Sequence, residues 1–319
     1  MGSYEGIEKK LIADFNIPYT GISTGKFRRY LDPKNFSDPF RVMKGFVEAR
    51  NYLKNYQPDV VFSKGGFVSV PVVRAAASLH IPCIIHESDM TPGLANKLCI
   101  PVAEKVCCNF PETMKNIPAD KAVLTGSPIR AELAQGSRLA GLNMCGFTAN
   151  KPVIMVIGGS LGAANVNKAV RDALPKLLED FQVVHLCGKD KIDNLLLNTP
   201  GYKQFEYIKA ELKDIFAMAD VVISRAGANA ICELLALKKP NILIPLPAAS
   251  SRGDQLLNAA SFEAQGYSIV LNEDDITTNL LVDKVHELYF NRQNYVEAMS
   301  RSHLSLIHIS EPTRLALIS

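Results

Sequence analysis

The sequence of 319 residues lacks an uninterrupted apolar run of the length that a membrane-spanning helix needs, about 18 residues. The longest candidate, residues 60–85, is broken by Lys64, Arg74 and His80. The opening residues, MGSYEGIEKK, are too polar for a secretory signal peptide. These absences predict a cytoplasmic chain without a membrane span.

The net charge of +3 is too small to indicate a nucleic-acid-binding protein. Its distribution is uneven, because residues 1–146 carry 18 Lys and Arg against 13 Asp and Glu, whereas the remainder carries 17 against 19. The first part is therefore the one suited to an anionic surface.

Cysteine is present, but not in a pattern typical of metal sites or disulfides. The seven cysteines contain no CxxC pair and are odd in number, and several lie in apolar runs. The sequence therefore predicts buried free thiols and no metal site.

Two common nucleotide-binding fingerprints are also missing, the P-loop GxxxxGK[ST] and the dinucleotide motif GxGxxG. In their place stands VIGGSLGAANVNKAV (156–170), an apolar run followed by glycines and a helical stretch. Gly158, Gly159 and Ser160 would bring N–H groups and a hydroxyl to the start of a helix, where anions are favoured. The alternative is an ordinary strand-to-helix turn.

Short apolar runs alternate with helical segments and predict an α/β fold with two doubly wound parallel sheets. We place strands at 59–63, 82–86, 105–110, 122–126, 153–158, 182–188, 204–208, 221–224, 241–245 and 267–271. The break falls between residues 132 and 151, where small and turn-forming residues gather. We therefore predict domains at 1–137 and 138–302, with 303–319 a non-native tail.

In the second half, polar residues follow predicted strands at their carboxyl ends, where open α/β sheets bind ligands. Arg225, Ala228 and Glu233 lie in SRAGANAICE, and the Glu233 carboxylate could accept hydrogen bonds from a ribose diol. Asp254, Gln255 and Asn258 start the next helix and suit sugar hydroxyls. The alternatives are a solvated helix face for Glu233 and simple N-capping by Asp254.

The first half has comparable clusters. A glycine turn, Lys64-Gly65-Gly66, follows one predicted strand, and His86, Glu87 and Asp89 gather at the end of another. Arg130 in TGSPIR lies near the domain break, where its guanidinium could reach a diphosphate. We predict a polar site at these strand ends.

Residues 26–46 interleave Lys and Arg with Phe and Tyr. That composition suits an anionic lipid surface, with cations on headgroups and aromatic rings at the interface. A solvated loop over a small aromatic cluster fits equally well.

Six segments in order, SKGGFVSVP, HESDMTPGLANK, TGSPIR, GGSLGAANVN, SRAGANAICE and SRGDQLLNA, carry a resemblance to a known family. Over residues 2–300 the chain resembles the MurG-type N-acetylglucosaminyltransferases of glycosyltransferase family 28. The resemblance implies a GT-B fold, two Rossmann-like domains facing each other across a cleft, and a peripheral position on the inner face of the bacterial plasma membrane.

The resemblance also implies a reaction and its substrates. The C4 hydroxyl of the N-acetylmuramyl group of lipid I would attack the anomeric carbon of UDP-GlcNAc with inversion, giving lipid II for peptidoglycan. The N-terminal domain would bind lipid I at the membrane and the C-terminal domain UDP-GlcNAc, with no cofactor and no metal.

Carried over by position, the resemblance assigns roles to individual residues. The diphosphate would contact Gly158, Gly159, Ser160 and Arg130, and the uracil would contact Tyr207 and Ile208. Residues 228–233 would line the nucleotide, with Glu233 on the ribose, and Gln255 with Asp254 and Asn258 would bind GlcNAc.

The chain departs from the family pattern at its start, where the family's first strand and GGTGGH-type loop are absent from the sequence. That loop carries the usual candidate for the catalytic base, so the base is left unassigned, with His86, Glu87 and Asp89 as the remaining candidates. The acceptor-side contacts would be Lys64, Gly65, Gly66, His86, Glu87 and Asp89. We expect the chain as written to keep donor-site residues and to have little transferase activity.

Two other functions are compatible with parts of the pattern, and a third is not. One is another GT-B enzyme acting on a different acceptor, including a UDP-GlcNAc 2-epimerase-like protein. A second is a non-catalytic module that binds a UDP-sugar. An NAD-dependent Rossmann enzyme is disfavoured, because the sequence has no GxGxxG with an acidic residue about 20 positions later.

Overall fold

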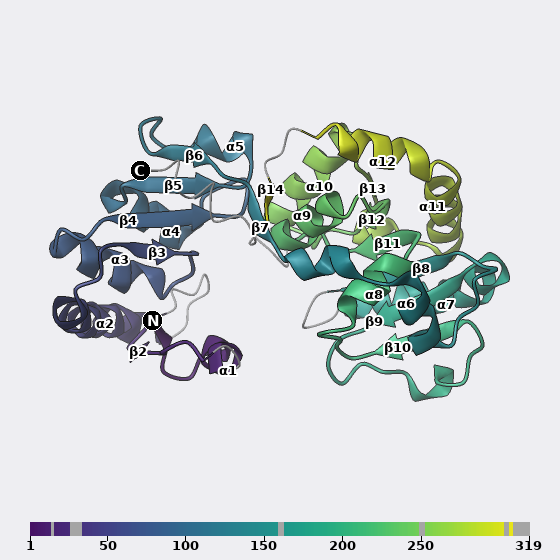
Figure 1. Ribbon diagram of the computed structural model, residues 1–319, viewed down its shortest axis with the longest axis horizontal. Helices are drawn as coiled ribbons and strands as arrows, with labels where there is room; N and C mark the ends of the chain where they lie inside the picture. The colour runs from purple at the N-terminus through teal and green to yellow at the C-terminus, as the bar shows by residue number, and fades with distance from the viewer. Residues whose placement is uncertain (14–15, 26–33, 159–162, 249–252, 303–305, 309–319) are drawn as a thin grey trace. The chain divides into compact units, whose positions relative to one another are not determined.

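The chain folds into two compact units, Met1–Gly126 and Ser127–Ser319, in a computed structural model (Figure 1). The structure describes residues 1–13, 16–25, 34–158, 163–248, 253–302 and 306–308. Each unit is described by itself.

The first unit is built on a four-stranded parallel sheet with the order β3-β4-β5-β6. Its strands are Val61–Ser63, Cys83–Glu87, Lys105–Cys108 and Ala122–Leu124, and β1 (Gly2–Ser3) and β2 (Gly21–Ile22) form a separate parallel pair. The helices are α1 (Ile7–Ala13), α2 (Lys34–Tyr56), α3 (Ser69–Ser78), α4 (Leu94–Cys99), η1 (Ile100–Val102) and α5 (Pro111–Met114).

Small residues explain how α3 covers this sheet. Ala75 and Ala76 are fully buried, and side chains of that size let the helix backbone approach β3 and β4 closely. Helix α2 then packs on α3 and adds Ala49 and Leu53 to the same apolar cluster. The core of this unit therefore lies between its sheet and the α2–α3 layer.

The second unit is built on a six-stranded parallel sheet with the order β10-β9-β8-β11-β12-β13. The strands are β8 (Val153–Ile157), β9 (Gln182–Leu186), β10 (Tyr202–Phe205), β11 (Val221–Ser224), β12 (Asn241–Leu243) and β13 (Ser268–Val270). Chain order reverses between β8 and β11, and such a switch point is where open α/β sheets bind ligands. The sequence-based prediction of a doubly wound parallel sheet is confirmed.

Both faces of this sheet are covered. On β8, Val153 and Met155 point to one face and Ile154 and Val156 to the other, and all four are fully buried. The surrounding helices are α6 (Arg138–Cys145), η2 (Ala131–Gln135), α7 (Ala164–Asp180), η3 (Asn194–Leu196), α8 (Leu212–Met218), α9 (Ala228–Ala236), α10 (Asp254–Ala264), η4 (Glu273–Asp275), α11 (Thr278–Phe290) and α12 (Arg292–Ser300), with α11 and α12 yellow in Figure 1. Burial on both sides is why the strands read as continuous apolar runs.

The division between the units falls after Gly126, earlier than the boundary we placed at residue 137. The segment after Gly126 packs on the second unit, because β7 (Ser127–Ile129) contacts α9 and η2 contacts α8. In addition, the Ser137 amide donates to Asp214 Oδ1 at 2.7 Å. Residues 127–137 are thereby anchored to the second unit.

All ten predicted strands overlap strands of the structure, although β10 begins at Tyr202, earlier than predicted. The short strands β1, β2, β7 and β14 (Leu306–His308) were not predicted. Strand β14 pairs in parallel with β7, and the rest of the predicted tail lies outside the described residues.

Candidate functional site

The carboxyl edge of the β8–β13 sheet collects most of the residues predicted for a nucleotide site. Gly158 follows β8 directly, and Ala228 begins α9 after β11. Gly159 and Ser160 lie outside the described residues, so their predicted contact with a diphosphate stays a prediction. The helix that follows, α7, starts at this switch point with its unpaired N–H groups and positive dipole end.

Arg130 and Glu233, 103 positions apart in the sequence, meet in the structure. Arg130 Nε donates to Glu233 Oε1 at 3.0 Å, and Nη2 donates to Oε2 at 3.1 Å. The Arg130 side chain is 44% exposed and that of Glu233 19%. Burial raises the pKa of Glu233, while the Arg130 charge opposes that rise. The two groups predicted for diphosphate and ribose therefore occupy one place and bind each other in the free chain.

Arg225, by contrast, is turned into the protein. It is only 8% exposed, and its Nη1 donates to Ile244 O at 3.0 Å and to Pro245 O at 3.2 Å. Its Nη2 forms an ion pair with Glu273, the first residue of η4. These bonds hold the strand ends together, and direct contact with substrate stays a prediction.

Of the residues predicted on α10, one is turned into the protein, as Arg225 is, and two are partly accessible. Asn258 is fully buried, and its Nδ2 donates to Ala226 O at 3.0 Å, which ties α10 to the loop after β11. Gln255 Oε1 accepts from the Leu246 amide at 3.1 Å. Asp254 and Gln255 are only partly buried at the start of the helix. Of the predicted GlcNAc contacts, these two are on the accessible end of α10.

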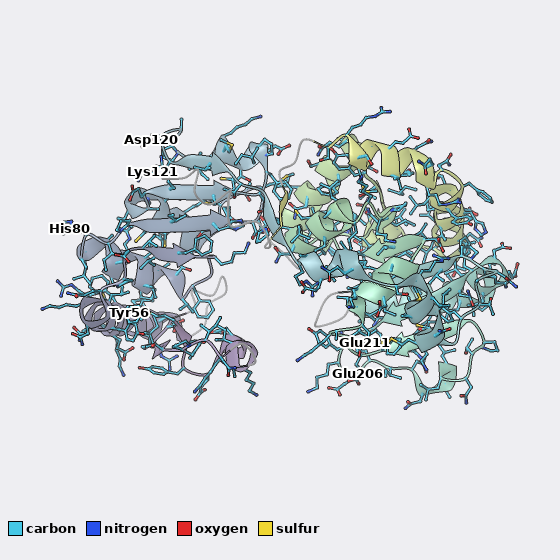
Figure 2. The ribbon with its side chains drawn as sticks, viewed as in Figure 1. Tyr56, His80, Asp120, Lys121, Glu206 and Glu211 are labelled. Atoms are coloured by element: carbon cyan, nitrogen blue, oxygen red, sulfur yellow. The ribbon has the colours of Figure 1, made fainter. Side chains whose placement is uncertain are left out.

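The predicted uracil contacts follow β10. The Tyr207 side chain is 62% exposed, whereas Ile208 is 5% exposed and anchors the loop. Glu206, labelled in Figure 2, follows β10 directly. Its Oε1 accepts from the Asp190 amide at 3.0 Å, so the loops after β9 and β10 are joined. An exposed aromatic ring on a fixed loop is suited to stacking on a planar base.

In the first unit, His86 and Lys64 lie at the ends of neighbouring strands. Lys64 Nζ donates to His86 Nδ1 at 2.9 Å, because an ammonium group has no acceptor, and Nε2 lies 3.4 Å from Gly126 O. Burial, with the Lys64 charge, lowers the pKa of His86 to about 4. The imidazole is therefore neutral near pH 7.

Glu87 organises the loop after β4. This carboxylate is 4% exposed and accepts from the Asp89 amide at 3.0 Å, the Gly93 amide at 2.9 Å and Asn96 Nδ2 at 2.8 Å. Its oxygens are therefore used within the unit, and Asp89 is partly buried beside it. The assignment of His86, Glu87 or Asp89 as a catalytic base stays a prediction.

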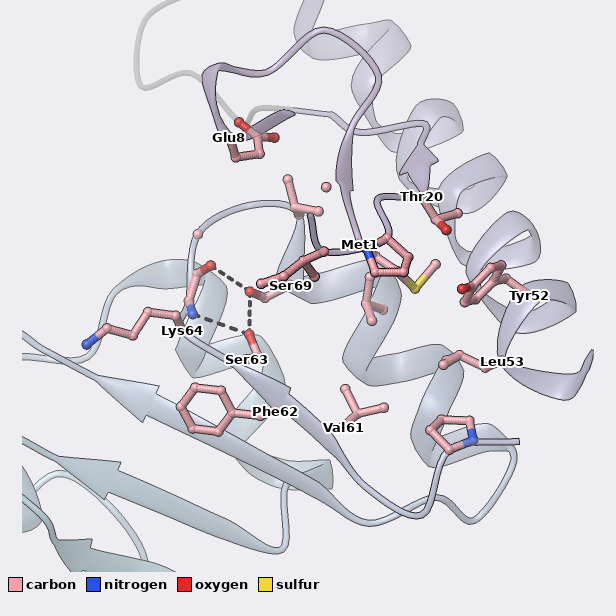
Figure 3. Close-up of a pocket in the computed structure, with 18 of the residues that line it drawn as sticks. Met1, Glu8, Thr20, Tyr52, Leu53, Val61, Phe62, Ser63, Lys64 and Ser69 are labelled. Atoms are coloured by element: carbon pink, nitrogen blue, oxygen red, sulfur yellow. Dashed lines mark hydrogen bonds between the residues drawn. The ribbon is translucent and has the colours of Figure 1, made fainter. Parts of the chain in front are cut away.

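A cavity of about 670 Å³ opens between the β1 end and β3 of this unit (Figure 3). Its lining includes the apolar side chains of Leu53 and Val61, and the turn after β3 contributes polar groups to it. There Ser63 Oγ donates to Ser69 Oγ at 2.5 Å, and Ser69 Oγ donates to Gly65 O at 2.7 Å. Gly65 and Gly66 have φ of +93° and +85°, which favour glycine. The predicted Lys64-Gly65-Gly66 turn is thus a fixed loop.

Within the described ranges, no helix is long and apolar enough to cross a membrane. The seven cysteines are free and buried, as predicted. Burial raises the pKa of the Cys99 and Cys145 thiols to about 11 and that of Cys108 to about 12. These thiols are therefore packing groups near neutral pH.

Two residues at the switch point were missed in the sequence, Asn165 and Glu273. Asn165 Nδ2 donates to Glu273, which also pairs with Arg225. Glu273 follows a predicted strand at its carboxyl end, the same signal that identified Arg225. Residues 273–275 are all acidic, however, and such a run is typical of a solvent-exposed turn. The sequence therefore did not single out Glu273 as a site residue.

The two parallel-sheet units and the switch point beside Arg130 and Glu233 define an α/β glycosyltransferase of the GT-B class. The glycosyltransferase family 28 N-terminal domain matches residues 1–108, and the family 28 C-terminal domain matches residues 153–310. The chain belongs to glycosyltransferase family 28.

Named relatives agree with this assignment. The chain is 64% identical over 302 residues to the UDP-N-acetylglucosamine--N-acetylmuramyl-(pentapeptide) pyrophosphoryl-undecaprenol N-acetylglucosamine transferase of Lachnoclostridium phytofermentans, covering 95% of this chain and 85% of the relative. Acinetobacter baumannii MurG is a solved structure with 28% identity and a TM-score of 0.71, covering 95% of this chain and 86% of that one. The Neisseria meningitidis UDP-GlcNAc 2-epimerase, at 13% identity and a TM-score of 0.61, covers 93% and 83% and shares the fold alone.

Proposed function

We propose that this chain is a UDP-GlcNAc-dependent N-acetylglucosaminyltransferase that glycosylates the muramyl C4 hydroxyl of lipid I and thereby makes lipid II for peptidoglycan. Family membership and relatives of 56–64% identity that carry this transferase name support the proposal. The observation that carries it is the meeting of Arg130 and Glu233 beside the switch point of the second unit.

On the donor side, each proposed contact uses a chemistry that its residue can supply. Tyr207 would stack on the uracil, and Glu233 would accept hydrogen bonds from the ribose diol. Gln255 holds the loop after β12 through Oε1, which leaves its amide nitrogen as the proposed donor to a GlcNAc hydroxyl. These groups follow three different strands of one sheet, β10, β11 and β12, a spread that suits an extended ligand.

The chemical step places negative charge on the departing diphosphate. The positive end of α7 and the Arg130 guanidinium would stabilise that charge, and stabilisation of developing charge is the largest contribution in many enzymes. The displacement breaks the bond between the anomeric carbon and the phosphate oxygen and forms a bond to the acceptor oxygen. The acceptor proton passes to a base that the described residues do not identify.

Titration calorimetry of UDP-GlcNAc against the chain tests the donor half of this proposal. We expect binding of the unaltered chain, and we expect Gln255→Ala to weaken it about tenfold, the effect of losing roughly one hydrogen bond to the sugar. Gln265→Ala is the matched control, because Gln265 is the same residue type at the other end of α10 and bonds only within that helix end.

Binding that is unchanged in Gln255→Ala would mean that the GlcNAc site has been misplaced. No binding to the unaltered chain would overturn the donor assignment itself. Transfer of GlcNAc to a lipid I analogue, measured in parallel, tests the acceptor half.

We also propose that the chain works as a peripheral protein on the inner, anionic face of the plasma membrane. Phe40, Met43 and Val47 are 78%, 62% and 52% exposed and share one face of α2 by their spacing. Arg41 and Lys44 lie beside them and are also exposed. Residues 26–33 of the predicted basic-aromatic stretch lie outside the described residues.

Vesicle co-sedimentation tests this surface. We expect binding to phosphatidylglycerol vesicles over phosphatidylcholine vesicles, and we expect the double variant Phe40→Ser and Met43→Ser to reduce the bound fraction about tenfold because exposed apolar area is lost. Phe290→Ser is the control, since Phe290 is 73% exposed on α11 of the other unit. Equal losses in both variants would contradict the assignment of α2 as the membrane surface.

A further inference from the structure

Arg225 and Glu273 form an ion pair that is buried at the carboxyl edge of the second sheet. Their side chains are 10% and 8% exposed. Arg225 also donates to the carbonyl oxygens of Ile244 and Pro245 at 3.0 and 3.2 Å, directly after β12. The guanidinium is therefore enclosed by protein acceptors and is committed to holding strand ends together.

Glu273 divides its two oxygens between separate elements. Oε2 pairs with Arg225 Nη2 in the loop after β11, and Oε1 accepts from Asn165 Nδ2. Asn165 is the second residue of α7, the helix that follows β8 in the chain. Glu273 itself begins η4, which follows β13. One carboxylate thus joins three elements of the rim, those that follow β8, β11 and β13.

The position of the α7 start has a consequence for ligand binding. Helix N–H groups bind an anion only where they point at it, and a displacement of about 1 Å is enough to lose most of that effect. A carboxylate that is shared by a buried guanidinium and an amide resists displacement, because moving it leaves charge unpaired in a medium of low dielectric.

We propose that Glu273 is a positioning residue that sets the start of α7 relative to the β11 loop, and that this placement is required for binding the diphosphate of the nucleotide. The inference rests on the proposed function. It assigns Arg225 to the same role, acting through Glu273 on the loops and not by touching the ligand.

The test compares UDP with uridine, because only UDP carries the group that the α7 start would bind. In Glu273→Gln the side chain keeps its shape, but one carboxylate oxygen becomes a donor, so it can satisfy Arg225 or Asn165 and not both. We expect the Kd for UDP to rise about tenfold and the Kd for uridine, measured by competition, to change less than about twofold.

Glu263→Gln is the matched control, since Glu263 is an exposed residue of α10 to which the same change of charge and shape applies. Asn165→Ala removes only the exposed partner, keeps the buried ion pair and should fold normally. We expect it to raise the UDP Kd about threefold, again with little effect on uridine.

A purely structural role would lower the thermal midpoint of Glu273→Gln and leave the ratio of the UDP and uridine Kd values unchanged. That result, in both Glu273→Gln and Asn165→Ala, overturns the inference while the proposed function stands. Failure of the unaltered chain to bind UDP overturns the proposed function and the inference with it.

Discussion

Acidification from pH 7 to pH 4 is expected to destabilise both units strongly, because each contains a buried neutral histidine. His86 in the first unit is 4% exposed, and His185 in the second is fully buried. Burial, with a nearby Lys64 or Arg171 charge, lowers the pKa of His86 to about 4 and that of His185 to about 3.

His185 shows why protonation is unfavourable. Its Nε2–H donates to Asn167 Oδ1 at 2.9 Å, since an amide oxygen can only accept, and Nδ1 accepts from the Tyr202 hydroxyl at 2.9 Å. Both nitrogens are therefore satisfied in the neutral form, inside the core beside α7 and β10. A second ring proton would add charge with no counter-ion in this network.

The direction of the effect follows from proton uptake on unfolding. The unfolded histidines titrate near pH 6.5, above both folded pKa values, so the unfolded state binds more protons below that pH. The stability that these two histidines contribute is fully present above pH 6.5. It is lost as the pH falls towards their folded pKa values of about 4 and about 3. At pH 4, each histidine has lowered the free energy of unfolding by roughly 3 kcal/mol, because one pKa unit corresponds to about 1.4 kcal/mol.

Urea unfolding between pH 7.5 and pH 4 measures this loss directly. His185→Gln and His86→Gln should each flatten the dependence of unfolding free energy on pH, although both also lower stability at pH 7. His80→Asn is the control, because His80 is exposed and has a φ of +59° that asparagine tolerates. A pH slope that is the same in all three variants would contradict the assignment of acid lability to the two buried histidines.

The second large effect is expected at Glu233. Glu233→Ala should weaken UDP-GlcNAc binding about 100-fold, because the ribose diol would lose two hydrogen bonds to a charged acceptor. In the free chain this carboxylate is held by Arg130, at 3.0 and 3.1 Å. Since the Arg130 side chain is 44% exposed, the pair is worth at most about 1 kcal/mol and can open when a ligand arrives.

Arg130→Ala distinguishes two roles of Arg130, binding the diphosphate and neutralising Glu233. The Arg130–Glu233 contact by itself is compatible with both. If Arg130 binds the diphosphate, the variant weakens UDP and, by releasing Glu233, binds uridine at least as well as the unaltered chain. If Arg130 only neutralises Glu233, UDP and uridine change together. The first result is the one we expect, with a loss of about tenfold for UDP.

The matched control is Arg138→Ala. Arg138 pairs with Asp220 in the same unit, with side chains 42% and 24% exposed, and lies on α6. Arg138→Ala should change stability slightly and leave nucleotide binding intact.

Similar UDP affinities in Glu233→Ala and the unaltered chain, measured by calorimetry, would remove Glu233 from the ligand site.

Much of the site could be predicted from sequence because parallel strands end at one edge. Arg130 was selected by its position at the end of an apolar strand, and Glu233 by its position more than a turn into the helix after another strand; the structure joins them. Arg225 was selected by the same rule, yet its side chain turns inward to Glu273. A strand-end position fixes where a residue lies along the chain, and it does not fix whether its side chain faces ligand or protein.

The sequence by itself determined the elements, because a strand buried on both faces must be apolar throughout and a turn between strand and helix favours glycine and small residues. It therefore predicted all ten main strands, the two-unit α/β class and the family. Only the tertiary structure decided the strand order around β8, the anchoring of residues 127–137 to the second unit, and the pairing of Glu273 with Asn165 and Arg225. Those features depend on which distant segments pack together, and the apolar pattern of a strand is the same whichever neighbour it meets.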